Sequence, residues 1–207
     1  MTDTVKIARA RATGVAKFKN EPLGDSAVKN VQKLMVPETI ASITEYGSEH
    51  GLRKSVIEFT KSGLTITKDA SNGGWGTLKL ATFPKGRIWV HGAVGTLSSV
   101  DVSGSDNIGD TGSGDYSFGT AATANTTLDG TAVDLAPSSA LIDPFVAGVG
   151  SANASSVLAA GALFDGSSAA KTVNMNIKFD NGDVTTGNGE ADVVGKITIL
   201  WSYLADY

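Results

Sequence analysis

The chain has 207 residues, of which about a third are Gly, Ser or Thr and only 18% are charged. It contains no cysteine and two histidines, which excludes disulfides and thiolate metal sites and leaves few groups for histidine-based catalysis. The net charge of −4 argues against nucleic acid as the main partner, and no apolar run approaches the roughly 18 residues that cross a bilayer. We therefore expect a globular domain with no nucleic-acid partner and no membrane partner.

The net charge combines two parts of opposite sign. Residues 1–40 carry seven Lys or Arg against four acidic residues, whereas the rest of the chain is acidic. No basic residue lies between Arg87 and Lys171, and that stretch holds eight aspartates. A solvated surface usually intersperses both signs, so this distribution favours a domain whose small-residue surfaces pack against another protein. The alternative is a small-residue β-domain without a partner.

We expect the first forty residues to form an N-terminal arm. Residues 5–11 alternate loosely and have no turn partner nearby, as in an extended segment. Asp25 is suited to cap a short helix at 26–35, and Pro37 would end it. One face of this helix is apolar, so we expect it to cover a sheet or to dock on a neighbour. That face comprises Ala27, Val28, Val31, Leu34 and Met35.

From about residue 40 the pattern becomes that of β-structure. Residues 55–60 and 64–67 flank Lys61-Ser62-Gly63, which predicts a hairpin. The stretch 137–166 is ambiguous, because 155–164 suits either a small helix or a β-segment of small residues. Further strands, separated by turn signals and by a polar loop, are expected at 77–83, 87–94, 97–102, 115–120 and 132–135.

The C-terminal third has the clearest pattern. Residues 172–179 alternate strictly between apolar and polar, which predicts a strand with one buried face. A final long strand is expected at 193–204. About eight strands, with turns roughly every 8–12 residues, predict an all-β fold, an antiparallel β-sandwich or jelly roll. The domain would span residues 41–207, after the arm at 1–40.

The residue types argue against an enzyme. Only His50 and His91 could act as the usual base for a nucleophile, and His91 falls in a strand beside Trp89, where a half-buried spacer is expected. The glycine-rich run 109–114 lacks the following helix and the lysine that a phosphate loop needs, and its aspartates would repel phosphate. We therefore predict no catalytic residue and no cofactor.

Calcium is the ligand that the acidic residues suit best, because two loop-rich segments each hold four carboxylates and Ca²⁺ takes about six to eight oxygens. The EF-hand spacing is absent, and Asp-Gly loops are commonly solvated turns, so we assign no metal site. The tryptophans are too scattered to line a sugar cleft and are expected in the core or at an interface. The carboxylates are Asp101, Asp106, Asp110 and Asp115, then Asp180, Asp183, Glu190 and Asp192; the tryptophans are Trp75, Trp89 and Trp201.

Several segments, in the same order, resemble a family of tailed-bacteriophage structural proteins. LATFPKGRIWVHGA at 80–93 is similar to the family's "FPxG, apolar strand, Gly-Ala" stretch, and GDYSFGTA at 114–121 with Leu128, Asp129 and Gly130 continues the pattern. DGSSAAK at 165–171 resembles the family's strand entry. The ending GKITILWSYLADY at 195–207 resembles its terminal strand, with Ala205 where Gly is common.

The resemblance covers roughly residues 45–207 and implies a virion protein, a head decoration or cement protein with a jelly-roll-like body. It implies binding to the major capsid protein on the phage head surface, after synthesis in the host cytoplasm, and it carries over no catalytic residue. We also expect association with other copies of the chain, as a dimer or trimer. The alternatives are a tail or fibre component of the virion and a carbohydrate-binding β-sandwich module.

Overall fold

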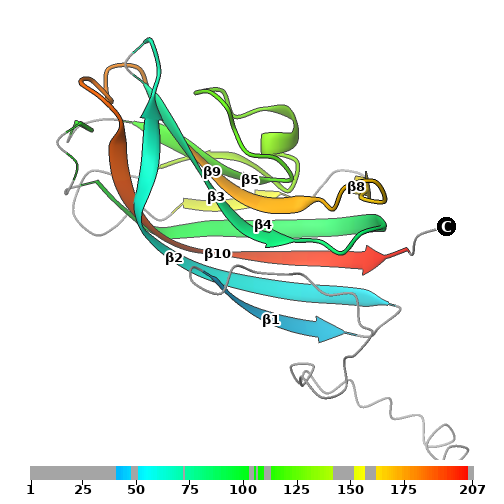
Figure 1. Cartoon of the computed structure of the whole chain (residues 1–207). Coiled ribbons are helices and arrows are strands. Elements are labelled where there is room, and N and C mark those ends of the chain that lie inside the picture. The colour runs from blue at the N-terminus through cyan, green and yellow to red at the C-terminus, as the bar shows by residue number, and fades with distance from the viewer. Residues whose placement is uncertain are drawn as a thin grey trace, which may run out of the picture.

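The computed structural model describes residues 41–47, 51–71, 73–102, 105, 107–109, 113–141, 152–156 and 162–204. The expected arm at 1–40, with its helix at 26–35, lies outside these residues, as does His50. The described part contains ten strands and one short 3₁₀ helix at Gly130–Ala132 (Figure 1). The strands are β1 (Ala41–Gly47), β2 (Leu52–Lys68), β3 (Gly74–Thr82), β4 (Arg87–Asp101), β5 (Gly114–Gly119), β6 (Ala136–Ala140), β7 (Ala152–Ser156), β8 (Ala162–Asp165), β9 (Thr172–Phe179) and β10 (Gly189–Tyr203).

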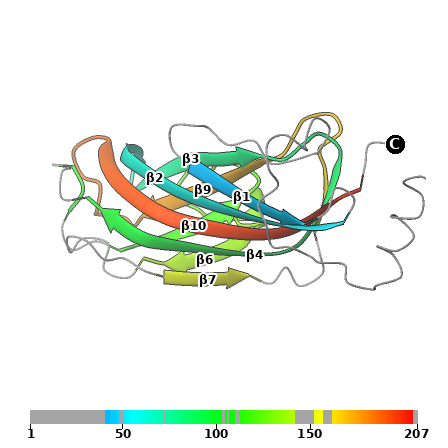
Figure 2. The same cartoon turned by 90° about the horizontal axis from the view of Figure 1, so that it is seen from below.

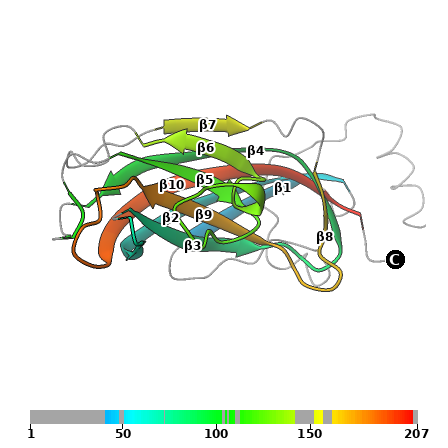
Figure 3. The same ribbon diagram turned by 90° about the horizontal axis from the view of Figure 1, so that it is seen from above.

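The strands form one curled sheet that folds over into two facing layers. Every strand pair is antiparallel, and the order along the sheet is β6-β5-β9-β3-β2-β10-β4-β7. We call the layer of β1, β2, β10, β4, β7 and β8 sheet B, and the layer of β3, β9, β5 and β6 sheet A. Strand β2 joins them, because most of its length pairs with β10 while Thr67 and Lys68 pair with β3. Views from below and above show the two layers (Figures 2 and 3). The predicted antiparallel all-β sandwich is confirmed.

The core lies between the two sheets and follows from the alternation within each strand. In β10, buried and exposed positions alternate almost without interruption, as expected for a strand with one face in the core. The Phe59 ring of sheet B meets the Phe118 ring of sheet A edge-on, with ring centroids 6.2 Å apart. Other fully buried side chains on the two inner faces include Ile57, Ile197, Ile199, Trp201, Leu80, Tyr116, Met175 and Ile177.

The long strands of sheet B correct two predictions. No hairpin forms at Lys61-Ser62-Gly63; β2 runs straight through, with a bulge where the register to β10 shifts between Ala191 and Val193. Gly63 takes φ +61°, the left-handed conformation that such a bulge requires and that glycine adopts without strain. Likewise the two strands predicted at 87–94 and 97–102 are the single strand β4. In total, the described residues form ten strands where about eight were expected.

Strand β9 has the predicted bounds but not the predicted exposure. Both of its faces are buried, because a loop that includes Ala121, Thr123 and Ala132 covers the polar face and hydrogen bonds to Asn176. The prediction of a strand at 132–135 is wrong, since the chain there forms the end of the 3₁₀ helix and leads into β6. For the ambiguous stretch 155–164, the described residues are β-structure, in β7 and β8.

Candidate interaction surface

The outer face of sheet B carries a cluster of exposed apolar side chains. The register places four residues of one cross-strand row on that face, running Leu52, Ser202, Trp89 and Leu163 over β2, β10, β4 and β8. Leu200 and Leu204 follow on the same face of the chain by alternation. We call this cluster the Trp89 patch; its exposed fractions are 54% for Leu52, 40% for Trp89, 57% for Leu163, 37% for Leu200 and 38% for Leu204. Figure 2 looks onto β2, β10 and β4 of this face.

The indole of Trp89 stacks on the ring of a neighbouring side chain. The His91 ring stacks on it, with centroids 6.0 Å apart and planes 19° apart. His91 Nε2 in turn lies 2.9 Å from Ser202 Oγ, which joins β4 to β10 at the centre of the patch. His91 is therefore exposed, not the half-buried spacer that the sequence predicted. A ring braced in this way loses little side-chain freedom on binding, which favours an aromatic anchor.

The contact between Ser202 and His91 has the residue types of a hydrolytic dyad but not its surroundings. Within the described residues, no carboxylate hydrogen bonds to His91 to orient its ring. The register between β4 and β10 shifts at His91, between Leu200 and Trp201, while on both sides of this shift the backbone of the two strands is paired in the sheet ladder. The pair is therefore a polar bridge within an apolar patch.

Polar and charged side chains surround the patch. Lys54 Nζ lies 5.5 Å from the centre of the Tyr46 ring on β1, and Arg87 is exposed at the start of β4. Towards the other end of the face, Val94 and Val194 are 49% and 38% exposed among threonines, serines and Lys196. An exposed apolar cluster with a polar rim is typical of a surface that binds another macromolecule.

The carboxylates that were considered for calcium are divided between two places. Asp115 and Asp180 lie together, but their shared partner is the Lys178 ammonium, at 2.9 Å and 3.0 Å. Ser113 bridges the same group, because its hydroxyl donates to Asp180 and its N–H donates to Asp183. The hydrogen bond from Ser113, opposed by burial and aided by Lys178, lowers the pKa of Asp180. These carboxylates are thus compensated by protein groups.

The second place is the bulge in β2, where Asp192 contacts Ser62, a residue 130 positions earlier in the chain. Asp192 accepts hydrogen bonds from the Ser62 hydroxyl and the Gly63 N–H, and these lower its pKa. Asp101 is its neighbour in the β4–β10 register, while Asp106 and Asp110 lie outside the described residues. Where the chain is described, no group of three or more His, Cys, Asp or Glu residues is arranged to hold a metal ion.

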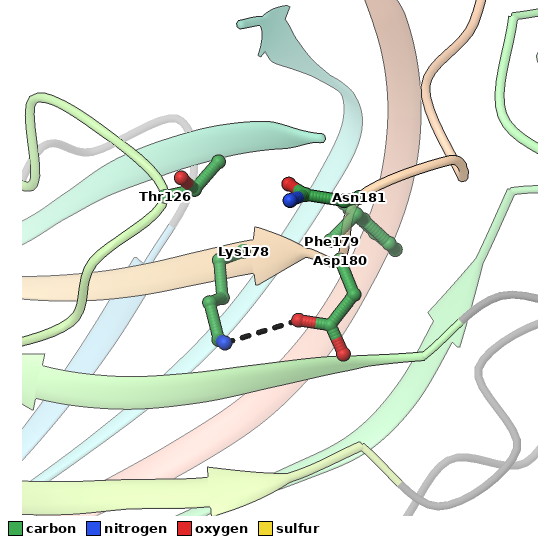
Figure 4. Close-up of a pocket in the computed structure, with 5 residues that line it drawn as sticks. All are labelled: Thr126, Lys178, Phe179, Asp180 and Asn181. Atoms are coloured by element: carbon green, nitrogen blue, oxygen red, sulfur yellow. Dashed lines mark hydrogen bonds and ion pairs between the residues drawn. The ribbon is translucent and has the colours of Figure 1, made fainter. Parts of the chain in front are cut away.

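A shallow cavity of about 400 Å³ opens beside the ion pairs of Lys178 (Figure 4). It is lined by Thr126, Lys178, Phe179, Asp180 and Asn181, and Lys178 is already paired with Asp180 at its wall. A sugar site usually offers an exposed aromatic ring, but the one aromatic residue among these, Phe179, is fully buried. The cavity is therefore polar and largely self-satisfied, and the Trp89 patch is the stronger candidate site.

The tryptophans are distributed between the core and the surface. Trp201 is fully buried, Trp75 is partly buried, and Trp89 is exposed in the patch. Sequence reasoning did not identify Leu52, Leu163 and Leu200 as surface residues. One signal was available: residues 199–204 are apolar or aromatic on both faces of the strand apart from Ser202, although a strand with one solvated face should alternate.

No helix in the described part of the chain is long and apolar enough to cross a membrane. No protein-family model matches the chain, and no curated protein matches it.

Proposed function

We propose that this protein is a non-enzymatic virion structural protein, a decoration or cement protein that binds the major capsid protein of a phage head. The resemblance of its segments at 80–93, 114–121, 165–171 and 195–207 to such proteins supports the class. The Trp89 patch is the observation that carries the proposed docking, because it supplies the exposed apolar surface that a binding protein needs.

The chemistry of the patch suits a protein–protein contact. Tryptophan and leucine on a flat face can fill shallow pockets of a partner, and truncating such an anchor typically costs roughly 2 kcal/mol or more of binding energy. Lys54 and Arg87 at the rim can meet acidic groups without being buried in the contact. On a symmetric shell, many copies bind at once, so each contact can be modest.

The test is a decoration assay on heads of the source phage assembled without this protein. Purified full-length chain is added at limiting concentration, and the bound copies are counted after sedimentation. We expect W89A and L200S to reduce the bound copies about tenfold, since each removes an apolar anchor. Val194→Ser is the matched control, because Val194 is a similarly exposed apolar residue on the same face, about 20 Å along β10 from Leu200.

Labelling of intact virions separates the rival functions. Signal on the head supports a decoration protein, and signal on the tail supports a tail or fibre component. Absence of the protein from virions overturns both. A glycan array that detects binding would instead support a carbohydrate-binding module, and the W89A variant would then show whether the patch is the sugar platform.

A further inference from the structure

Among the described residues, strand β1 is a regular edge strand of sheet B. It pairs with β2 over all seven of its residues, from Ala41 opposite Phe59 to Gly47 opposite Arg53, without a register shift. No described strand pairs with its other edge, and Figure 1 shows it outermost in the sheet. Natural edges are usually blocked by proline, lysine or a bulge, and β1 has none of these.

One further blocking device is a charge that points into the sheet interior, and Glu45 occupies that position. Its carboxylate is already largely removed from water, because it is only 9% exposed, and it accepts a hydrogen bond from Ser55 Oγ at 3.2 Å. Ser55 is held in turn by the indole N–H of Trp201 at 2.8 Å. An added strand would therefore cover a carboxylate that has already lost its water, so Glu45 does not block the edge.

We propose that β1 pairs antiparallel with β1 of a second copy, about a two-fold axis at Thr44. In that register Ser42 lies opposite Tyr46 of the second copy, Ile43 lies opposite its Glu45, and Thr44 lies opposite its Thr44. The outward side chains at the seam are all uncharged, and on the inward side each Glu45 lies opposite an isoleucine and diagonal to the other Glu45. Such a two-fold contact is isologous, which is the commonest arrangement of homodimers.

The pairing extends each cross-strand row from one copy into the next. A row that contains Glu58 and Ser42 of one copy continues into Tyr46 and Lys54 of the other. The Glu58 and Lys54 charges are then three strand spacings apart, about 14 Å, which exceeds the Debye length at physiological salt, so they add little. The backbone hydrogen bonds of the two strands supply the affinity.

This inference deepens the self-association in the proposed function by naming the surface and the partner. The two outer faces of sheet B would join into one continuous surface, so a dimer would present two Trp89 patches to a shell. Two linked contacts dissociate far more slowly than one. The pairing itself is a property of the purified chain and is testable without virions.

Cysteine cross-linking gives the first test, because the natural chain has no cysteine. In T44C, the two introduced thiols would face each other across the axis at a spacing that a disulfide can bridge. We expect mild oxidation of the full chain to convert T44C to a covalent dimer at least tenfold faster than T60C. Thr60 is the matched control, since it is exposed and lies on β2 beyond the paired strand. Equal rates for the two variants would overturn the proposal.

Charge reversal gives the second test, read out by sedimentation of the full chain over a range of concentrations. T44K and T44E each place like charges at the axis and should weaken dimerisation roughly tenfold. A one-to-one mixture of T44K and T44E should restore it, whereas T60K should dimerise as the unmodified chain does. A chain that is monomeric throughout, or a mixture that does not recover, overturns the pairing. A monomeric chain that still decorates heads would leave the proposed function standing.

Discussion

The Asp192 carboxylate accepts a hydrogen bond from the backbone N–H of Gly63, with 2.7 Å between oxygen and nitrogen. Its other oxygen accepts the Ser62 hydroxyl. A β-bulge leaves backbone groups without a ladder partner, and here a side chain of the adjacent strand supplies one. The bulge lets β2 continue past residue 63 to pair with β3, so this contact helps to hold sheet A and sheet B together.

We predict that D192N weakens the fold by at most about 1 kcal/mol at neutral pH, because the pair faces solvent. The Ser62 and Gly63 hydrogen bonds hold the pKa of Asp192 below its ordinary value of 3.8. The stabilisation is thus present above that ordinary pKa and is lost as the pH falls through the lower, folded pKa. Urea unfolding at several pH values should show the two proteins converging below pH 3.8. A constant difference down to strong acid would contradict the assignment.

Gly95 on β4 lies directly beneath the Phe118 ring, and a Cβ at residue 95 would overlap that ring. The ring is confined by Phe59 and Tyr116, at centroid distances of 6.2 Å and 6.0 Å, so it cannot move aside freely. We predict that G95A destabilises the protein by about 1–3 kcal/mol.

The control for this prediction is G92A in the same strand, since a Cβ at Gly92 would have no atom within 4 Å. Its change in unfolding free energy should stay within about 0.5 kcal/mol. Urea denaturation of both variants provides the measurement, and equal losses would show that backbone entropy, not the Phe118 contact, governs the two sites.

Asn176 is fully buried on β9 and makes four hydrogen bonds. Its amide nitrogen donates to the carbonyls of Ala121 and Ala132, and its oxygen accepts from the Thr77 hydroxyl and the Thr123 N–H. We predict that N176L costs about 3 kcal/mol, because it leaves several of these groups without a partner. Thermal unfolding measures the loss.

Hydrogen exchange at the Thr123 amide supplies a local readout for N176L. This amide should exchange faster in the variant than in the unmodified protein. N174L is the comparison, because the amide of Asn174 makes one close hydrogen bond, at 2.8 Å to Thr172, and one at 3.4 Å. It should lose less than half as much stability. A loss in N174L as large as that in N176L would contradict the proposed role of the Asn176 network.

Local periodicity predicted the fold class and the bounds of β9, because alternation reports burial directly. It failed at residues 61–63, where Lys-Ser-Gly has the composition of a hairpin turn. The difference between a turn and a bulge there depends on Asp192, which is distant in the sequence, so no local pattern could reveal it. The same holds for Asn176, whose partners all come from other elements.

The candidate surface was predictable only in part. The apolar residues on both faces of 199–204 indicated a covered outer face, but Leu52 and Leu163 join the patch only through strand register. The calcium hypothesis rested on carboxylates that are clustered in sequence. The register of β5 and β9 instead brings Lys178, which is two residues from Asp180 in the chain, beside Asp115, and spacing along the chain could not reveal that second contact.

The Lys178 cluster leads to a prediction in alkali. The hydrogen bond to Asp115 raises the pKa of Lys178 above its ordinary value of 10.5, against the effect of burial and with help from Asp180. Because the folded pKa is the higher one, the stabilisation is complete below pH 10.5 and is lost as the pH rises through the folded pKa. We predict that K178M loses about 1 kcal/mol at neutral pH, since Asp115 and Asp180 would then face each other without the cation.

The measurement is the urea midpoint of the unmodified protein and of K178M from neutral pH to alkali. The two midpoints should approach each other above pH 10.5, where the unmodified protein loses the lysine charge. K79M serves as the control, because Lys79 is an exposed lysine of β3 whose loss breaks none of these contacts. If K79M shows the same convergence, general lysine titration explains it and not the contacts of Lys178 with Asp115 and Asp180.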